Sequence, residues 1–225
     1  FLAAADQTIL ASALPSIAAE QGAMADLSWV VVGYLLAATV AAPLYGYLGD
    51  RYGRRRMLLM ALVVFTSASV ACVFAPDFVW LVLFRALQGL GGGGLMTLAQ
   101  ALIGEHVSPR ERGRFAGYFA TVFALASTSG PVLGAYLTEH FGWRSVFVVN
   151  VPLGLIAAML ALRIPPPPAA RAPRLHALDV PGAVLFSIAT TCLPFALTSG
   201  GHRFAWGSWQ LSAVFAAAAA GAVGL

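Results

Sequence analysis

The sequence predicts an all-α membrane protein with a six-helix N-terminal bundle and two further transmembrane helices. Only 10% of the 225 residues are charged and 60% are hydrophobic, whereas about a quarter of a soluble domain is charged. The apolar residues fall in blocks of roughly 18–25, the helix length that crosses about 30 Å of hydrocarbon. No block alternates between apolar and polar residues as the strands of a membrane barrel do. The chain is therefore expected to lie in a lipid bilayer.

Eight apolar blocks define the predicted organisation. They cover residues 1–19, 28–48, 57–75, 79–103, 115–137, 145–163, 181–199 and 208–225. We expect three regions: a six-helix bundle over 1–163, a cytoplasmic proline-rich linker over 164–180, and two extra helices over 181–225, the second truncated. The linker opens with four consecutive prolines, which cannot continue a helix. Phe1 in place of Met, and terminal blocks without polar flanks, predict that the chain is a piece of a longer protein.

The arginines predict how the chain is oriented in the membrane. All 13 basic residues are Arg, and most follow the second, fourth and sixth blocks. These are Arg51, Arg54, Arg55, Arg56, Arg110, Arg112, Arg114, Arg163, Arg171 and Arg174. The positive-inside rule places such turns in the cytoplasm, so we expect a multi-pass protein of the cell inner (plasma) membrane. Because these arginines border the spans, they do not form a nucleic-acid-binding patch, and no nucleic acid is expected as a partner.

Two charged residues fall inside predicted spans. Glu20 marks the outer end of the first block. Asp6 lies about 20 Å inward from Glu20 along the predicted helix. A carboxylate in hydrocarbon costs about 2.5–3.5 kcal/mol or more, so Asp6 is expected to face a cavity or a partner and to serve as a proton carrier. The alternative is a solvated Asp at a frayed helix start. Arg85 is either a cavity cation or a side chain that snorkels to the surface, and a direct pair with Asp6 remains an open alternative.

Glycines interrupt the fourth and fifth blocks. Residues 89–94 fit the spacing G-x-G-x-x-G, but a dinucleotide site requires a preceding strand, so we expect close helix packing there instead. Gly130, Pro131 and Gly134 predict a bend in the fifth helix. That bend is either a hinge between two transport states or a static kink.

The remaining motifs do not indicate catalysis. The turn after the second block has a specific spacing of small and charged residues: Gly46, Asp50, Arg51, Gly53, Arg54 and Arg55. The chain has no Lys for a phosphate-binding loop and no hydrolase or redox motif. Cys72 and Cys192 lie in apolar blocks, as packing residues do. We therefore expect neither an enzyme nor a metal site.

Several of these segments resemble signatures of the major facilitator superfamily, and of its 14-helix drug:proton antiporter branch in particular. The turn at 46–58 resembles the signature between helices 2 and 3, and Arg85, Gln88 and Gly89 resemble the helix-4 motif. Gly130, Pro131 and Gly134 resemble the helix-5 antiporter motif, with Ala135 in place of its usual second glycine. Residues 6–15, 143–154, 179–182 and 206–209 resemble the first-helix, sixth-helix and following signatures of the branch.

The resemblance implies a fold in which two six-helix bundles rock around a central cavity, and inward proton flux drives substrate outward. Asp6 would then couple transport to protons or cations, and Arg85 would line the cavity. Asp50 and Arg54 would latch the bundles on the cytoplasmic side, and Gly130 with Pro131 would shape the helix that controls leak.

The same resemblance implies efflux of amphipathic drugs or other toxic small molecules. The energy source would be the proton gradient, with no cofactor. The expected partners are the lipid bilayer, a small-molecule substrate, protons and a periplasmic adaptor protein. Two alternatives stay open: an importer or uniporter of a metabolite, and a membrane sensor or scaffold that transports nothing.

Overall fold

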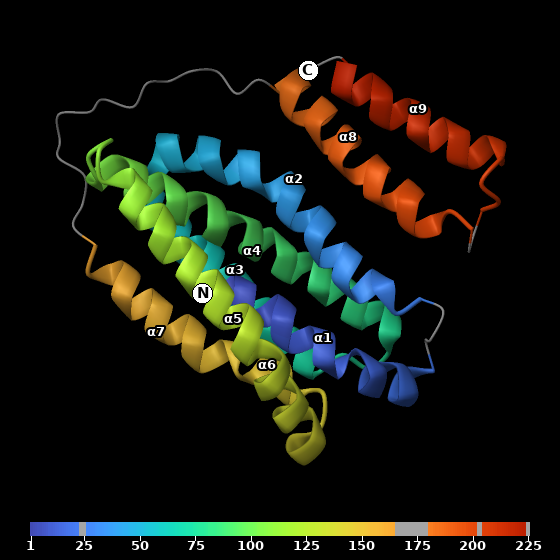
Figure 1. Cartoon of the computed structure of the whole chain (residues 1–225), viewed down its shortest axis with the longest axis horizontal. Helices are drawn as coiled ribbons and strands as arrows, with labels where there is room; N and C mark the ends of the chain where they lie inside the picture. The colour runs from blue at the N-terminus through green and yellow to red at the C-terminus, as the bar shows by residue number, and fades with distance from the viewer. Residues whose placement is uncertain (23–25, 165–179, 202–203, 224–225) are drawn as a thin grey trace.

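The computed structural model describes residues 1–22, 26–164, 180–201 and 204–223, which are almost entirely helical (Figure 1). The helices are α1 (Leu2–Gln21), α2 (Ser28–Tyr52), α3 (Arg54–Val73), α4 (Phe78–His106), α5 (Arg112–Phe141), α6 (Ser145–Val148), α7 (Asn150–Leu162), α8 (Val180–Ser199) and α9 (Trp209–Val223). Across the described ranges, β-type pairing is limited to one isolated bridge between Gly200 and Phe204. The predicted all-α fold is confirmed.

Within the described ranges, six stretches are long and apolar enough to cross a membrane: α1 to α5, and the 18-residue segment Ser145–Leu162 that joins α6 and α7. They correspond to the first six predicted blocks. Helices α8 and α9 contain shorter apolar stretches, Pro181–Leu197 and Trp209–Ala222. That these two also cross the membrane stays a prediction, as does the division into bundle, linker and extra helices. Residues 165–179, most of the predicted linker, lie outside the described residues.

The sixth block is a single predicted span but two helices in the structure. Helix α6 ends at Val148 and α7 begins at Asn150, with Val149 between them. Pro152 has no N–H to donate to the carbonyl of Val148, so one helical hydrogen bond is missing there. The backbone stays in the helical region at Val149, with φ −60° and ψ −28°, so Asn150 follows on a continuous helical path.

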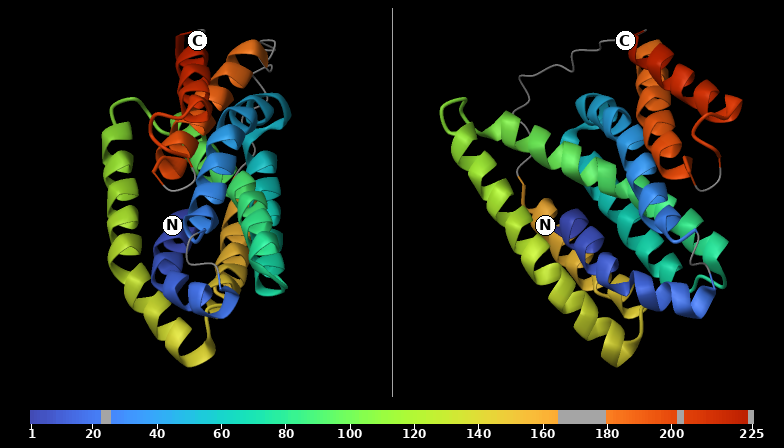
Figure 2. Two further views of the ribbon diagram at one scale, coloured as in Figure 1. Left: turned by 90° about the vertical axis from the view of Figure 1, so that its right-hand side faces the viewer. Right: turned by 45° about the vertical axis from the view of Figure 1, so that its right-hand side comes forward.

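Helix α4 is central to the bundle. It packs against both α2 and α3, whereas α1 packs mainly against α5, and α7 against α3. Figure 2 shows α8 and α9 as a hairpin beside α2. Apolar side chains fill two clusters, one around Ile9, Leu81 and Phe147, the other around Phe65 and Leu98. Because lipid is as apolar as these side chains, close packing between helices is what holds such a bundle together.

The glycine run of α4 lies where helices approach most closely. A Cβ added to Gly89 would meet the backbone of Tyr34 in α2, and one added to Gly93 would meet the backbone of Ala38. A Cβ on Gly91 would meet the backbone of α3 at Phe65. The glycines therefore allow α4 to contact both neighbouring helices, and the close-packing interpretation of residues 89–94 is confirmed.

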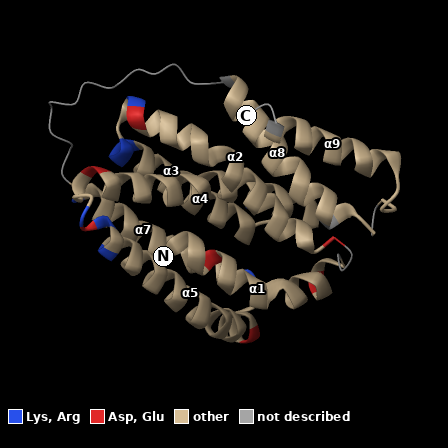
Figure 3. Ribbon diagram, turned by 45° about the horizontal axis from the view of Figure 1, so that its top comes forward, with Lys and Arg blue, Asp and Glu red and all other residues tan. Residues whose placement is uncertain are grey.

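The arginine-rich turns gather at one end of the bundle (Figure 3). Arg55, after the α2–α3 turn, donates to the carbonyls of Ala161 and Leu162 at the end of α7. Arg112, at the start of α5, donates to the carbonyl of Gly104 near the end of α4. Arginines next to helix C-termini are favoured by the partial negative charge there. The turns at 51–56 and 110–114 and the end of α7 thus lie at one end of the bundle, as the alternating charge pattern requires.

Candidate functional site

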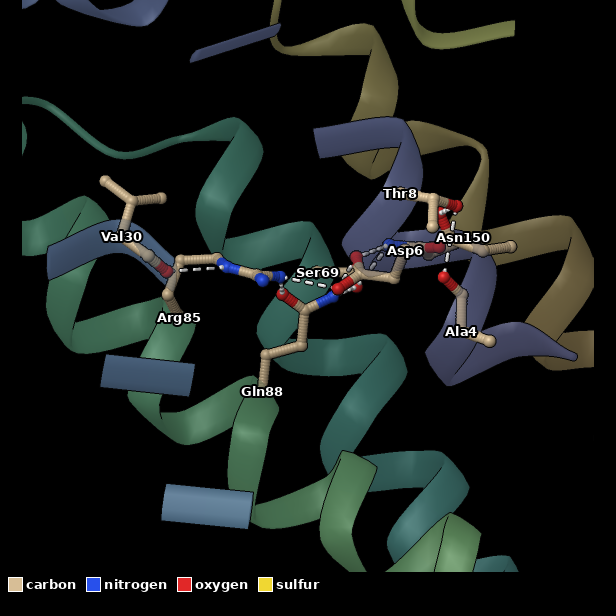
Figure 4. A network of polar contacts seen from close by, with 9 residues as sticks. Ala4, Asp6, Thr8, Val30, Ser69, Arg85, Gln88 and Asn150 are labelled. Atoms are coloured by element: carbon tan, nitrogen blue, oxygen red, sulfur yellow. Dashed lines mark hydrogen bonds and ion pairs between the residues drawn. The ribbon is translucent and has the colours of Figure 1, made fainter. Parts of the chain in front are cut away.

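The two charged residues predicted inside the spans form an ion pair within the bundle (Figure 4). Arg85 Nη1, from α4, lies 2.7 Å from Asp6 Oδ2, from α1. Arg85 is 0% exposed and Asp6 is 3% exposed. Such burial contradicts both a solvated Asp6 and a snorkelling Arg85. The direct pair was the open alternative, and the structure contains it.

Three uncharged polar side chains complete the site. Gln88 Nε2 donates to Asp6 Oδ1 at 3.0 Å and to Ser69 Oγ at 2.5 Å. Asn150 Nδ2 donates to the same two oxygens, at 2.6 Å and 3.2 Å. Gln88 Oε1 accepts from Arg85 Nη1 at 2.5 Å. All three residues are 0% exposed, so helices α1, α3, α4 and α7 meet in one buried polar network.

The network is built to hold a negative charge on Asp6. Its carboxylate accepts from three donors: the guanidinium of Arg85 and the amides of Gln88 and Asn150. A buried carboxylate is tolerated only when it is paired and hydrogen-bonded. Taking up a proton would remove the negative charge that these three donors share.

Aromatic rings enclose the other side of Arg85. Its guanidinium carbon lies 4.5 Å from the ring centre of Tyr34 and 5.9 Å from that of Phe147. Its Nε donates to the carbonyl of Val30 at 3.3 Å, while Nη2 has no hydrogen-bond partner in the described part of the chain. The negative faces of the rings offset part of the cost of burying this cation.

Local sequence explains why these groups converge. Arg85 and Gln88 are three residues apart in α4, so they share one helix face. Asp77 accepts a hydrogen bond from the backbone N–H of Trp80 at 3.0 Å and so caps the start of α4. Asn150 is the first residue of α7, which packs against α3, and its side chain reaches Ser69 of that helix.

The motif at the α2–α3 turn lies apart from this network, at the arginine-rich end. Arg54 donates to Asp50 Oδ1 through Nη2 at 2.8 Å and Nε at 3.1 Å. Its Nη1 donates to the carbonyl of Ala101, and Nε lies 3.5 Å from Glu105 Oε1. Gly53 makes the one-residue turn possible because its φ of 96° suits only glycine.

The other members of this motif have simpler surroundings. Arg51 donates to the hydroxyl of Tyr47 at 3.1 Å, and Gly46 faces Thr97 of α4. The structure thus connects the turn to the ends of α4 and α7. Its proposed latch role against a second bundle stays a prediction.

The helix-5 motif packs against α1 rather than joining the polar network. A Cβ added to Gly130 would meet the side chain of Thr8, and one added to Gly134 would meet Ser12 and the carbonyl of Ile9. Thr8 Oγ1 lies 3.0 Å from the carbonyl of Ala126. Helix α5 continues through Pro131 without a break, so its predicted hinge role remains a prediction.

Sequence reasoning missed part of the site. Asn150 was noted only as part of a family-like signature, and Ser69 and Tyr34 were not singled out. A polar residue inside an apolar span was the available signal for Asn150. A single Ser or Tyr in an apolar helix carries no such signal, because both are also ordinary packing residues of membrane helices.

A metal or thiol site among the described residues would require particular side chains in a suitable arrangement. In the ranges that the structure describes, no three His, Cys, Asp or Glu side chains gather to hold a metal ion. Cys72 is buried in the apolar core, and Cys192 is partly buried in α8.

Comparison with known proteins identifies the family. The model of the Major Facilitator Superfamily matches residues 1–225. The chain is 36% identical over 214 residues to Multidrug resistance protein 3 of Bacillus subtilis, covering 95% of this chain and 41% of that protein. It is 34% identical over 223 residues to the Multidrug transporter protein MdtP of the same organism, covering 99% and 41%.

A relative in Mycobacterium tuberculosis, an uncharacterised MFS-type transporter, is 42% identical over 207 residues, covering 92% of this chain and 30% of that protein. The chain therefore spans between 30% and 41% of the length of these three curated relatives.

Solved structures show the same fold. The inward-open xylose transporter XylE of E. coli matches with a TM-score of 0.61 and 21% identity, over 92% of this chain and 55% of that one. The human organic anion transporter MFSD10 matches with a TM-score of 0.63 and 19% identity, over 95% and 57%. Members of this family are integral membrane transporters rather than enzymes, which agrees with the absence of catalytic motifs. The chain belongs to the major facilitator superfamily.

Proposed function

We propose that the chain forms the N-terminal bundle of a proton-coupled exporter of amphipathic drugs and other toxic small molecules, of the 14-helix antiporter branch. The observation that carries this proposal is the buried network around Asp6. Asp6 is the one buried carboxylate among the described residues. Buried ionisable groups in membrane proteins are costly, and they are typical of proton and ion pathways.

The network suggests how proton binding would favour one transport state. While Asp6 is ionised, Arg85, Gln88 and Asn150 hold α1 to α4 and α7. Protonation removes the charge that attracts Arg85, so the arrangement with these helices drawn together becomes less favourable. A proton thereby changes the populations of two conformations, which is the requirement for coupling.

The relatives support export as the direction. Two bacterial proteins that are 34–36% identical are named for multidrug resistance or transport, and a fungal protein that is 36% identical is named an efflux pump. An exporter would need no cofactor beyond the proton gradient, and a periplasmic adaptor protein is proposed as a partner.

We further propose that the bundle lies in the cell inner membrane with its arginine-rich end in the cytoplasm. The support is the gathering of the turns at 51–56 and 110–114 at one end, together with the positive-inside rule. Single cysteines placed in these turns should be labelled only from the cytoplasmic side. Labelling from outside would contradict this orientation.

Efflux from cells tests the proposed function. The full-length gene is expressed in a strain without its own efflux pumps, and efflux of ethidium is followed by fluorescence. The wild type should expel ethidium only while the proton gradient is intact. Asp6→Asn should abolish this proton-driven efflux, because a side-chain amide does not take up and release a proton as a carboxyl group does.

The matched control is Asp77→Asn. Asp77 is exposed and caps α4 through a side-chain oxygen that Asn also supplies, so this variant should retain efflux. Proton-driven efflux that survives in Asp6→Asn would contradict the coupling role. Uptake of ethidium by the wild type in place of efflux would instead favour the importer alternative.

A further inference from the structure

Asn150 presents an asymmetry that the proton-carrier role of Asp6 does not explain. Its Nδ2 donates to two oxygens, Asp6 Oδ1 and Ser69 Oγ. Its Oδ1 is buried and has no hydrogen-bond partner within the described residues. A buried polar atom left without a partner costs about 1–3 kcal/mol. The same side chain thus makes two contacts on one side and none on the other.

The donor and acceptor roles of the groups around Asp6 relate this asymmetry to the charge of its carboxylate. Gln88 and Asn150 each direct an amide nitrogen at Asp6 Oδ1 and at Ser69 Oγ. These four atoms therefore form a closed ring in which the amides are donors and the oxygens acceptors. The arrangement suits an ionised carboxylate, which only accepts hydrogen bonds.

Protonation of Asp6 would turn one acceptor of this ring into a hydrogen-bond donor. When a proton from water adds to Oδ1, the carboxyl group becomes a donor and needs an acceptor. The carbonyl of Gln88 already accepts from Arg85. The carbonyl of Asn150 is unpaired, and a half-turn of the amide about its last side-chain bond would bring it to face Asp6 Oδ1 and Ser69 Oγ. Both hydroxyl groups could then donate to it.

We propose that Asn150 is a positioning residue that senses the protonation of Asp6: its amide donates to the ionised carboxylate and turns over to accept from the protonated one. Asn150 is the first residue of α7. The hydrogen bond between α1 and α7 would therefore persist in both states but change its direction. This inference rests on the proposed function only for the role that it gives to proton uptake by Asp6.

The other groups near Asp6 are few. Arg85 of α4 is paired with it, and Tyr34 of α2 and Cys72 of α3 interact with it electrostatically. Helices α6 and α7 contain no charged residue, and the charged residues of α5 lie near its two ends. Among these neighbours, Asn150 is the amide whose carbonyl stays unpaired.

Infrared difference spectroscopy of the full-length protein in lipid tests this inference without requiring transport. Asn150 is the only asparagine of the 225-residue sequence, so asparagine with a ¹³C-labelled side-chain amide marks one position in this chain. Spectra recorded at acidic pH minus alkaline pH should contain a protonated-carboxyl band that Asp6→Asn removes. They should also contain a downshift of the labelled amide carbonyl, since a carbonyl that accepts a hydrogen bond absorbs at lower frequency.

Two variants assign the amide signal. Asn150→Leu removes it, and Asn150→Gln removes the label while keeping an amide, which covers the case in which the leucine variant does not fold. In both variants the downshift should disappear while the carboxyl band remains. In Asp6→Ala, which adds no second labelled asparagine, the downshift should also disappear, because no proton is taken up.

Different experimental results would contradict the role of Asn150 and the proposed export function. A carboxyl band from Asp6 without any shift of the Asn150 carbonyl would overturn the role of Asn150 and leave proton coupling intact. The absence of any carboxyl band that depends on Asp6 would also overturn it. An Asn150 shift in a protein that does not expel ethidium would support this inference while contradicting the proposed export.

Discussion

At the residue scale, the central feature is a fully buried arginine whose charge is balanced by one buried carboxylate. A buried ion pair adds little net stability, because removing both charges from water costs about as much as their attraction returns. Removing one partner is different, since the other charge is then left uncompensated. Arg85 and Asp6 therefore depend on each other even if the pair contributes little to folding.

The first prediction concerns this dependence. Arg85→Leu should lower the stability of the protein by about 3–5 kcal/mol, because it leaves the buried Asp6 without its cation. The measurement is the thermal unfolding midpoint of the purified protein.

Arg144→Leu is the matched control. Arg144 pairs with Glu20 through Nη1 and Oε1 at 2.5 Å, but the side chains are 39% and 50% exposed. Removing an exposed pair should change stability by about 1 kcal/mol or less. Equal losses in the two variants would contradict a buried charge pair between Asp6 and Arg85.

Only part of the buried polar network could be predicted from the sequence. Asp6 and Arg85 were recognisable as costly charges inside apolar spans, but the sequence left open whether they form a pair. Ser69 was not recognisable, because its part in the site depends on which face α3 turns toward α4, and that is decided by packing between helices.

At the element scale, α4 is fixed by how closely its backbone approaches its neighbours. A Cβ on Gly93 would lie 2.8 Å from the carbonyl carbon of Ala38 and 2.9 Å from its Cα. Backbone atoms cannot move aside as the end of a flexible side chain can. The contact between α2 and α4 therefore requires glycine at this position.

The second prediction is that Gly93→Ala destabilises the protein by about 1–3 kcal/mol, the usual cost of overpacking. Alanine is the better helix former by about 1 kcal/mol, so a loss of stability would mean that packing outweighs propensity. Gly117→Ala in α5 is the control, because nothing lies within 4 Å of its added Cβ.

Gly117→Ala should leave the thermal unfolding midpoint unchanged or raise it. If Gly93→Ala also raised the midpoint, α4 could not approach α2 as closely as described. The glycine run itself predicted a close contact from sequence. Which glycine faces which helix could not be read from it, since consecutive residues of a helix point in different directions.

The division between α6 and α7 shows a similar limit. Hydropathy alone merges residues 145–163 into one span, because both helices are apolar. Pro152 was the available local signal, since it removes a backbone donor for Val148. The consequence for function, an asparagine at the start of α7 directed at Asp6, appears only in three dimensions.

At the scale of the whole molecule, hydropathy and charge were sufficient to predict the architecture. Six of the predicted blocks are helices long enough to span a membrane, and the arginine-rich turns meet at one end. This succeeded because the bilayer imposes one helix length and one charge bias on every span. The substrate could not be predicted in this way, because side-chain contacts in a cavity decide it rather than a repeating pattern.

The claim that joins these scales is that the buried Asp6 couples proton movement to export. The most direct measurement uses the full-length transporter in proteoliposomes with an ethidium gradient, no imposed pH gradient and a fluorescent pH indicator inside. The wild type should move protons opposite to ethidium, whereas Asp6→Asn should move ethidium without protons. Proton movement that persists unchanged in Asp6→Asn would contradict the account.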